Sequence, residues 1–327
     1  MIQDQPGCAN ISPVSPALRA CGVLVGAVAV VLVLGCGEGE EPAGPGAAPA
    51  RASARPVLCT RLRAQVTGEV ATSGATELSG LAISRSQSGV LWTHNDSGDV
   101  PRVFAVTTRG RVLAELSVPG AEARDWEDIA VGPGPSGRPA LYLADIGDNA
   151  TERSSVTVYR VREPRVPAAA GGSTAPAGAL ALRYPDGAHD AEALLVSPTS
   201  GALFIVTKAY SGRAGVYLAA HPRLGSTTTL RRVGTVSLGN GDAVTAGDVS
   251  SNGRTIALRS YFRALVWSRR RGESIAAALK RRPCAARADL IDEGQGESLA
   301  LARDGRAFYT VPEGNRPDIR RYSPAKR

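Results

Sequence analysis

Short runs of alternating hydrophobic and polar residues recur along the chain, each followed by a glycine turn and a second run. In the clearest copy, Asp125–Ala130 is followed by Leu141–Asp145. Side chains that alternate in this way are typical of β-strands. The turn glycines lie at 89, 137, 201, 253 and 305, with spacings of 48, 64, 52 and 52 residues. Repeats of about 40 to 50 residues, with four short strands each, predict the blades of a β-propeller.

The pattern therefore predicts an all-β fold of five four-stranded blades. The blades occupy residues 77–117, 125–183, 190–237, 244–291 and 296–322. In the fourth blade we expect a short helix at 272–280 and an outer strand at 287–291. The fifth blade has three strands, and the isolated strand 61–70 supplies its fourth, which closes the ring and leaves no long open edge. Six blades, or another all-β sandwich or barrel, stay open as alternatives.

The direction of the strands assigns each loop to one of two faces. Loops between blades, and loops joining second to third strands, share one face, which we call the acidic face because most acidic clusters lie in it. Its loops are 94–100, 118–125, 145–153, 186–190, 208–215, 239–248, 292–295 and 312–318. The opposite face receives small, polar and mildly basic turns. These turns are 84–89, 132–138, 197–201, 250–254 and 303–306. We expect the functional site on the acidic face.

Aligning the repeats places three carboxylates in one column of the innermost strands. The column contains Ser79, Glu127, Glu192, Gly247 and Glu297. Carboxylates that converge on a pore repel one another unless a cation compensates, and oxygen ligands of this kind suit Ca²⁺. The predicted metal site consists of Glu127, Glu192 and Glu297 with the loop residues Asp145, Asp148 and Asn149. Such loop residues also cap turns through side-chain to backbone hydrogen bonds, and for these three both interpretations stay open.

Catalytic motifs are few. The sequence has no Gly-x-Ser-x-Gly, His-Glu-x-x-His or Cys-x-x-Cys motif. His94 and His189 fall near the predicted mouth of the pore, where either could act as a general base, although a structural histidine is the commoner case. Basic residues on the same face could hold a phosphate or a carboxylate, or simply form salt bridges. The predicted ligand-binding residues are Lys208, Arg153, Asp96 and Asp190. For Asp96 the pattern favours a turn-capping role.

The N-terminal segment is typical of an export signal. Residues 20–34 form a continuous apolar run of the length of a signal-peptide core, too short for an ordinary membrane span. The run ends in Val33-Leu34-Gly35-Cys36, which resembles a bacterial lipobox with Cys36 as the lipidated residue. We therefore predict a signal peptide at 1–35, a Gly/Pro/Ala-rich tether at 36–56, and a propeller at 57–327. An ordinary cleaved signal or an uncleaved anchor is the alternative.

Export changes the meaning of the cysteines. Cys8 and Cys21 would leave with the signal, and Cys36 would take the lipid, so that Cys59 and Cys284 remain. Two cysteines in an oxidising compartment are a candidate disulfide. Two buried free thiols are the alternative.

The net charge of +8 comes mainly from arginines that are scattered singly, apart from Arg269–Arg271 and Lys280–Arg282. A nucleic-acid footprint needs a stripe of basic residues beside stacking aromatics, and aromatics make up only 5% of the chain. We therefore expect no nucleic-acid partner.

Four segments carry a resemblance to a known group of proteins. They are 78–82, 91–98 (LWTHNDSG), 125–130 (DWEDIA) and 145–149 (DIGDN). Over 77–164 the chain resembles secreted bacterial β-propeller proteins of the type labelled WD-repeat-like or "esterase-like activity of phytase". The resemblance implies a propeller outside the cytoplasm. It carries over no active site, because no phytase calcium or phosphate motif is matched residue by residue.

Three functions remain open from the sequence. The first is a lipid-anchored, extracytoplasmic propeller that binds a small molecule or protein on its acidic face, with Ca²⁺ in the pore. The second is a metal-dependent hydrolase of phosphoesters, as in phytases, or of lactones. The third is a structural envelope scaffold in which the acidic loops only cap turns.

Overall fold

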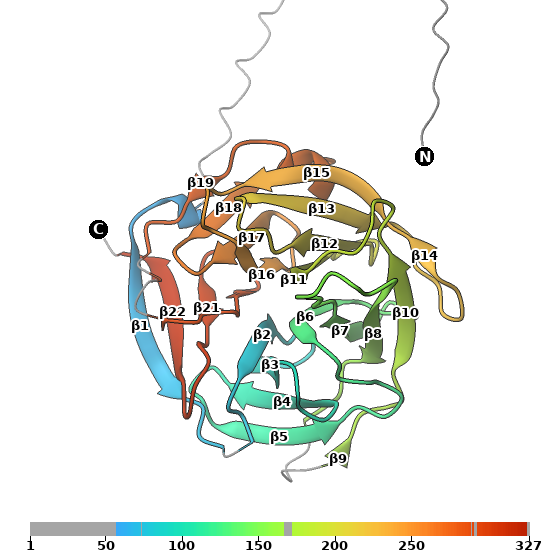
Figure 1. The fold of residues 1–327 in the computed structure, drawn as a ribbon. Helices are drawn as coiled ribbons and strands as arrows, with labels where there is room; N and C mark the ends of the chain where they lie inside the picture. Colours follow the sequence, from blue (N-terminus) through green and yellow to red (C-terminus); the bar gives the residue numbers. More distant parts are fainter. Residues whose placement is uncertain (1–56, 73, 167–171, 289, 291–292, 326–327) are drawn as a thin grey trace, which may run out of the picture. The chain divides into compact units, whose positions relative to one another are not determined.

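The chain is a closed ring of five antiparallel sheets around a common axis (Figure 1). The computed structural model describes residues 57–72, 74–166, 172–288, 290 and 293–325. The predicted signal peptide, the tether and Cys36 lie outside these residues. Residues from Ser53 onward form one compact unit. Within the part of the chain that the structure describes, no helix combines the length and the apolar character needed to cross a membrane.

Each sheet is one blade, and the innermost strands line the axis (Figure 1). From the inside outward, the first blade contains β2 (Leu78–Ile83), β3 (Val90–Asn95), β4 (Arg102–Thr107) and β5 (Val112–Ser117). The second contains β6 (Trp126–Pro133), β7 (Pro139–Asp145), β8 (Val156–Arg162) and β10 (Gly178–Arg183). The third contains β11 (Ala191–Val196), β12 (Leu203–Thr207), β13 (Arg213–Ala219) and β15 (Arg231–Ser237). The fourth blade contains β16 (Val244–Val249), β17 (Thr255–Ser260), β18 (Ala264–Ser268) and β19 (Cys284–Ala285). The fifth contains β20 (Ala300–Leu301), β21 (Phe308–Thr310), β22 (Asp318–Pro324) and β1 (Leu62–Glu69).

The ring closes where the sequence predicted. Strand β1 pairs antiparallel with β22, in a register that sets Leu62 opposite Pro324 and Ala64 opposite Tyr322. The last blade is therefore built from both ends of the domain, and the predicted five-bladed propeller is confirmed. Two short edge strands, β9 (Gly172–Ser173) and β14 (Thr228–Thr229), add a fifth strand to the first and second blades.

Apolar side chains pack between neighbouring blades. The three tryptophans, Trp92, Trp126 and Trp267, are buried to within 2% of their surface. Their indole N–H groups all find acceptors, as buried indoles require: the N–H of Trp92 donates to Glu163 at 3.1 Å, and that of Trp126 donates to the Glu122 carbonyl at 2.7 Å. The tryptophans are therefore part of the core, not a ligand platform.

The fourth blade differs from the prediction in its outer strand. That strand is β19 at Cys284–Ala285 and not 287–291, because the chain has already left the blade by then. The carbonyl of Arg287 accepts the backbone N–H of Leu62 at 2.9 Å, so this segment joins the start of β1. The predicted helix is α1 (Ile275–Leu279), which begins where the Ser274 side chain accepts the N–H of Ala277.

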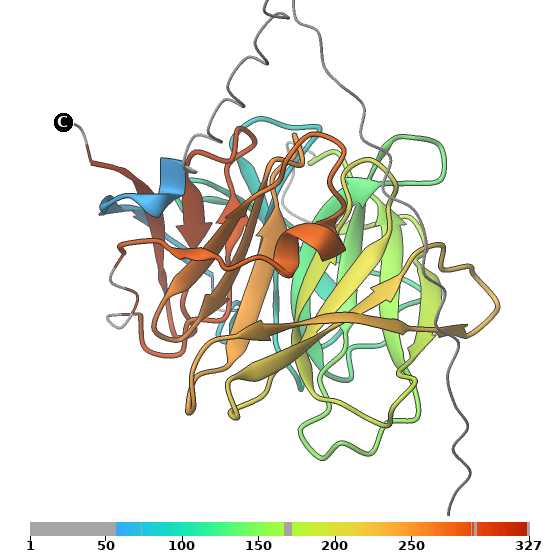
Figure 2. The same ribbon diagram turned by 90° about the horizontal axis from the view of Figure 1, so that it is seen from above.

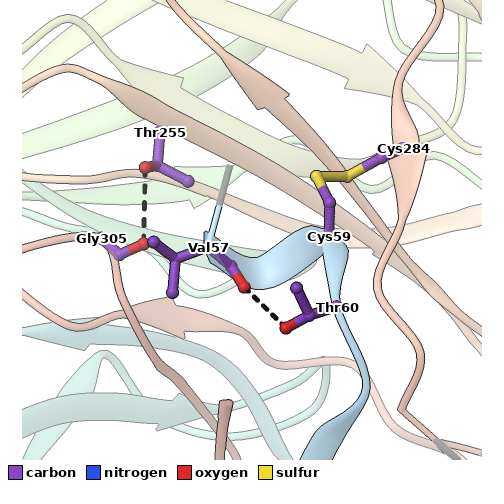
Figure 3. The surroundings of a disulfide bond; sticks show 6 residues. All are labelled: Val57, Cys59, Thr60, Thr255, Cys284 and Gly305. Atoms are coloured by element: carbon purple, nitrogen blue, oxygen red, sulfur yellow. Dashed lines mark hydrogen bonds between the residues drawn. A yellow bond between two sulfur atoms is a disulfide. The ribbon is translucent and has the colours of Figure 1, made fainter. Parts of the chain in front are cut away.

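A disulfide joins Cys59, in the short 3₁₀ helix η1 (Val57–Cys59), to Cys284 on β19 (Figure 3). The two Cα atoms are 5.7 Å apart. The bond links the outer edges of the fourth and fifth blades, beside the place where β1 closes the ring.

The innermost strands carry a shared irregularity that corrects one part of the predicted column. A register shift interrupts β6 between Trp126 and Asp128, and β16 shifts in the same way between Val244 and Ala246. Gly247 pairs with Leu258, which is the position that Ile129 holds in the second blade. The fourth member of the column that contains Glu127 is therefore Thr245, two residues before Gly247.

Candidate functional site

Seven carboxylates gather at the acidic end of the pore. Two lie on innermost strands, and the others lie in segments that precede an innermost strand or follow a second strand: Asp96, Asp125, Glu127, Asp190, Glu192, Glu297 and Glu313. Glu127 lies on β6 and Glu192 on β11, both where the register shifts, so the irregular backbone accommodates them at the pore. Two neighbouring loops contribute the aspartates that precede these strands. We call this set the acidic cluster.

The cluster forms three overlapping trios. In each, one carboxylate oxygen per residue lies within 4.8 Å of the others, as in a set of ligands around one ion. The trios are Asp96, Glu297 and Glu313; Asp96, Asp125 and Glu127; and Glu127, Asp190 and Glu192. Because Asp96 and Glu127 each belong to two trios, the carboxylates form a continuous row.

One lysine opposes this negative charge. The ammonium of Lys208 contacts Oε1 of Glu192, with the lysine side chain 12% exposed. The hydroxyl of Tyr261 donates to Oε1 of Glu297 at 2.8 Å. The other oxygen of Glu192, Oε2, is buried without a hydrogen-bond partner among the described residues, as is Oδ1 of Asp96. Buried oxygens without a donor are costly, so both are available to a cation.

The pKa values in the cluster reflect burial and mutual repulsion. Burial, followed by the charge of Glu297, raises the pKa of Glu192 to about 8, although Lys208 lowers it. Burial and the neighbouring Glu192 raise the pKa of Glu127 well above its usual range. Burial and a hydrogen bond with Glu297 raise the pKa of Glu313 to about 8. Without a cation, part of this row is therefore protonated at neutral pH.

Burial and neighbouring charges also shift the pKa values of Asp96 and Lys208. Burial raises the pKa of Asp96 to about 6, and the charges of Glu297 and Asp125 add to this shift. Burial lowers the pKa of Lys208, but the carboxylate of Glu192 outweighs burial, so that the net shift is upward and the lysine stays charged.

Gly147 fits closely against the cluster. A Cβ atom on this glycine would lie 2.1 Å from Oε1 of Glu127 and 2.5 Å from Oδ2 of Asp125. Any side chain at this position would therefore push against two carboxylates. The Asp-Ile-Gly-Asp-Asn segment therefore contributes to the site because Gly147 leaves room for the carboxylates of Glu127 and Asp125. Its own acidic side chains do not join the cluster.

The acidic side chains of that segment have structural partners, which corrects the predicted metal ligands Asp145 and Asp148. Oδ1 of Asp145 accepts Nη1 of Arg153 at 2.8 Å, inside the protein. The Asp148 carboxylate accepts the backbone N–H groups of Glu152 and Arg153 at 3.0 and 2.9 Å, which caps the loop. Asn149 is exposed. Arg153, predicted to bind ligand, is buried in this loop and also donates to the Gly147 carbonyl.

The structure separates the two histidines proposed as bases. His94 is fully buried, with its ring edge-on to Trp126 at 5.4 Å and Nδ1 against the Asn95 carbonyl. Burial lowers its pKa to about 4. The ring is therefore buried and neutral and lies outside the carboxylate trios, which favours the structural role for His94.

His189 lies at the surface instead, with 32% of its side chain exposed. Its Nε2 is 3.0 Å from Oδ1 of Asp186 and 2.9 Å from the hydroxyl of Tyr217. It immediately precedes Asp190 of the acidic cluster.

Sequence reasoning missed three members of the site: Asp125, Glu313 and Tyr261. Asp125 and Glu313 fall in loops that the strand directions had already assigned to the acidic face, so the loop list contained the signal. Asp96 and Asp190, predicted to bind ligand, belong to the trios of carboxylates.

Comparisons with known proteins add little beyond the fold. No protein-family model matches the chain, and no curated protein matches its sequence. Among solved structures, a gluconolactonase from Xanthomonas campestris is similar at 16% identity and a TM-score of 0.45, over 86% of this chain and 98% of that one. The apo form of a soluble aldose sugar dehydrogenase from Escherichia coli is similar at 12% identity and a TM-score of 0.45, over 81% and 100%.

Proposed function

We propose that the protein is a Ca²⁺-binding β-propeller that holds an anionic ligand, or an anionic group of a partner protein, on its acidic face. The observation that carries the proposal is the continuous row of seven carboxylates, in which Oε2 of Glu192 is buried and unpartnered. With its carboxylates ionised, this row would hold a large excess of negative charge in a partly buried space, which Lys208 and the nearby Arg153 do not balance. A divalent cation is the simplest compensation.

The donor set favours a hard cation. All seven side chains offer carboxylate oxygens, and no described histidine or cysteine joins a trio. Ca²⁺ takes six to eight oxygens with flexible geometry, which suits ligands from several loops. Glu127, Asp190 and Glu192 would hold such an ion at one position of the row. Asp96, Glu297 and Glu313 form the neighbouring trio, which offers a second position. When bound, the ion would supply positive charge at the mouth of the pore.

Lys208 supports the anionic class of ligand. Its ammonium has three N–H donors, and its contact with Glu192 uses one of them. The partly exposed lysine beside a bound Ca²⁺ would present two positively charged groups to a ligand. A phosphate or carboxylate group matches that arrangement.

The test is calorimetric titration of inorganic phosphate, as the probe, into the oxidised domain from Ser53 onward. We expect saturable heat with calcium present and none in the presence of a chelator. Lys208→Met should weaken phosphate binding at least tenfold, whereas Lys280→Met, at an exposed lysine at the C-cap of α1, should leave it unchanged. Calcium binding without any phosphate binding would refute the anionic ligand class and leave only the cation site.

The location is proposed from sequence alone. The apolar run at 20–34 and Cys36 support a lipid anchor on the outer side of a bacterial membrane. Globomycin, which blocks lipoprotein signal cleavage, should cause a larger precursor to accumulate. A mature protein of unchanged size and without a lipid on Cys36, as measured by mass spectrometry, would count against the anchor.

A metal-dependent hydrolase is the second candidate, and His189 is the observation that favours it. Its imidazole is exposed, oriented by Asp186 and Tyr217, and adjacent in sequence to Asp190 of the acidic cluster. A general base needs this combination of access and orientation. Turnover of phosphoesters or lactones that requires calcium and is lost in His189→Gln would support this candidate over simple binding.

A further inference from the structure

The opposite face of the propeller carries two clusters of basic residues. Its turns contact one another around the axis. The guanidinium of Arg303 donates to the carbonyls of Ser84 and Gln87, and the Gln87 side chain in turn bonds the backbone of Pro164 and Val166. The turns of the fourth and fifth blades meet through Thr255, which donates to the Gly305 carbonyl (Figure 3).

Arginines dominate this surface. Eight are exposed: Arg138, Arg162, Arg165, Arg254, Arg270, Arg271, Arg303 and Arg306. Arg138, Arg162 and Arg165 line one hollow together, and Arg254, Arg270 and Arg271 line a second with Arg269. Within the turns and edge segments that carry these arginines, all of them in the described part of the chain, Asp304 is the one exposed acidic side chain, and Glu163 is buried. Glu273, half-buried beside Arg271, accepts the Arg270 N–H and pairs with the Arg281 guanidinium, so acidic groups offset only part of this charge.

The first described residues also lie at this end of the propeller. Strand β22 follows the acidic-face loop 312–318 and runs toward the opposite face, where Pro324 pairs with Leu62 at the start of β1. Because η1 directly precedes β1, Val57 lies at the basic end of the propeller. Figure 2 shows η1, in blue, toward the upper end of the ring in that view.

We propose that the opposite face docks on an anionic lipid bilayer, with the arginines bound to phosphate headgroups. Guanidinium groups pair with phosphate in a bidentate way, and a basic patch is attracted to an anionic surface over about one Debye length. The entry of the chain at Val57, 21 positions after Cys36, matches this orientation. The acidic cluster would then face away from the membrane.

This inference is independent of the proposed calcium site, because it concerns the other end of the pore. The test is co-sedimentation of the domain from Ser53 onward, which lacks the apolar run and Cys36, with vesicles. Phosphatidylcholine vesicles are compared with vesicles that contain phosphatidylglycerol as the anionic lipid. We expect binding only to the anionic vesicles, and we expect it to weaken as salt rises. Arg162→Gln/Arg165→Gln should reduce binding about thirtyfold, at about 1 kcal/mol per arginine.

The matched control is Arg124→Gln/Arg213→Gln. It removes the same charge from two exposed arginines at the acidic end and should bind vesicles like the parent protein. An equal loss in both double variants would show a general effect of net charge and would overturn the docking face. Equal binding to the two kinds of vesicle, no binding to either, or tighter binding to double-stranded DNA at matched phosphate concentration would also overturn it.

Discussion

Asp128 is the side chain on which the packing of three blades most depends. It is fully buried on β6. Its Oδ1 accepts the N–H of Ile129 at 2.8 Å, and its Oδ2 accepts the N–H groups of Leu194 at 2.8 Å and Gly247 at 3.3 Å. One carboxylate thus joins the innermost strands of the second, third and fourth blades.

Replacing Asp128 by Ala would leave two backbone N–H groups of neighbouring blades buried without an acceptor. Each unsatisfied group costs about 1–3 kcal/mol, so we expect the free energy of unfolding to fall by about 2–6 kcal/mol. Asp248 offers a matched comparison. Its carboxylate accepts the N–H of Val249 and one N–H from the next blade, that of Leu301 at 2.8 Å. Asp248→Ala should therefore cost about half as much.

The assay is equilibrium unfolding in urea, followed by the fluorescence of the three buried tryptophans. Calcium should be absent, so that the acidic cluster does not contribute to the difference. A loss for Asp128→Ala no larger than that for Asp248→Ala would refute the reasoning. It would mean that the blades are held by apolar packing alone.

Three further predictions concern the disulfide and the acidic cluster. Cys59→Ser/Cys284→Ser should lower the free energy of unfolding in urea by about 5 kcal/mol, the chain-entropy value for a separation of 225 residues, and an unchanged midpoint would contradict it. Because the pKa of Glu192 rises from 4.5 to about 8 on folding, this side chain should stabilise the calcium-free protein below about pH 4.5, and its contribution should be lost as the pH rises through about 8; a melting temperature of the parent that does not fall relative to that of Glu192→Gln over this range would contradict the sign. Gly147→Ala should weaken calcium binding about tenfold in a calorimetric titration, because its Cβ would displace Glu127, and parental affinity would show that the carboxylate can move aside.

Much of the fold could be predicted because each blade repeats the same local signals. Alternation at period two gave the strands, and glycines with positive φ at 89, 137, 201, 253 and 305 marked the same turn in every blade. The closing strand was predictable because the last repeat had one strand too few. The outer strand of the fourth blade was not, because a long-range pairing between Arg287 and Leu62 decides where the chain leaves that blade.

The candidate site was predictable at the level of a face and less so at the level of side chains. Strand direction brought the acidic loops together, and the column of Glu127, Glu192 and Glu297 follows from the repeat. Whether Asp145 faces the pore depends on Arg153, which lies eight residues away and draws its carboxylate inward. No local pattern reports such a partner. For His94 the structure agrees with the structural role that the sequence favoured, since its ring packs against Trp126 of the next blade.

The central claim is that the acidic cluster holds calcium, and calorimetric titration of Ca²⁺ into the oxidised domain from Ser53 onward tests it most directly. The comparison uses Glu127→Gln/Glu192→Gln and a control, Glu122→Gln/Glu152→Gln, which removes the same charge from exposed positions in acidic-face loops. We predict saturable binding in the parent and the control, and none in the first double variant. Folded proteins that all fail to bind calcium, or a first variant that binds like the control, would contradict the account.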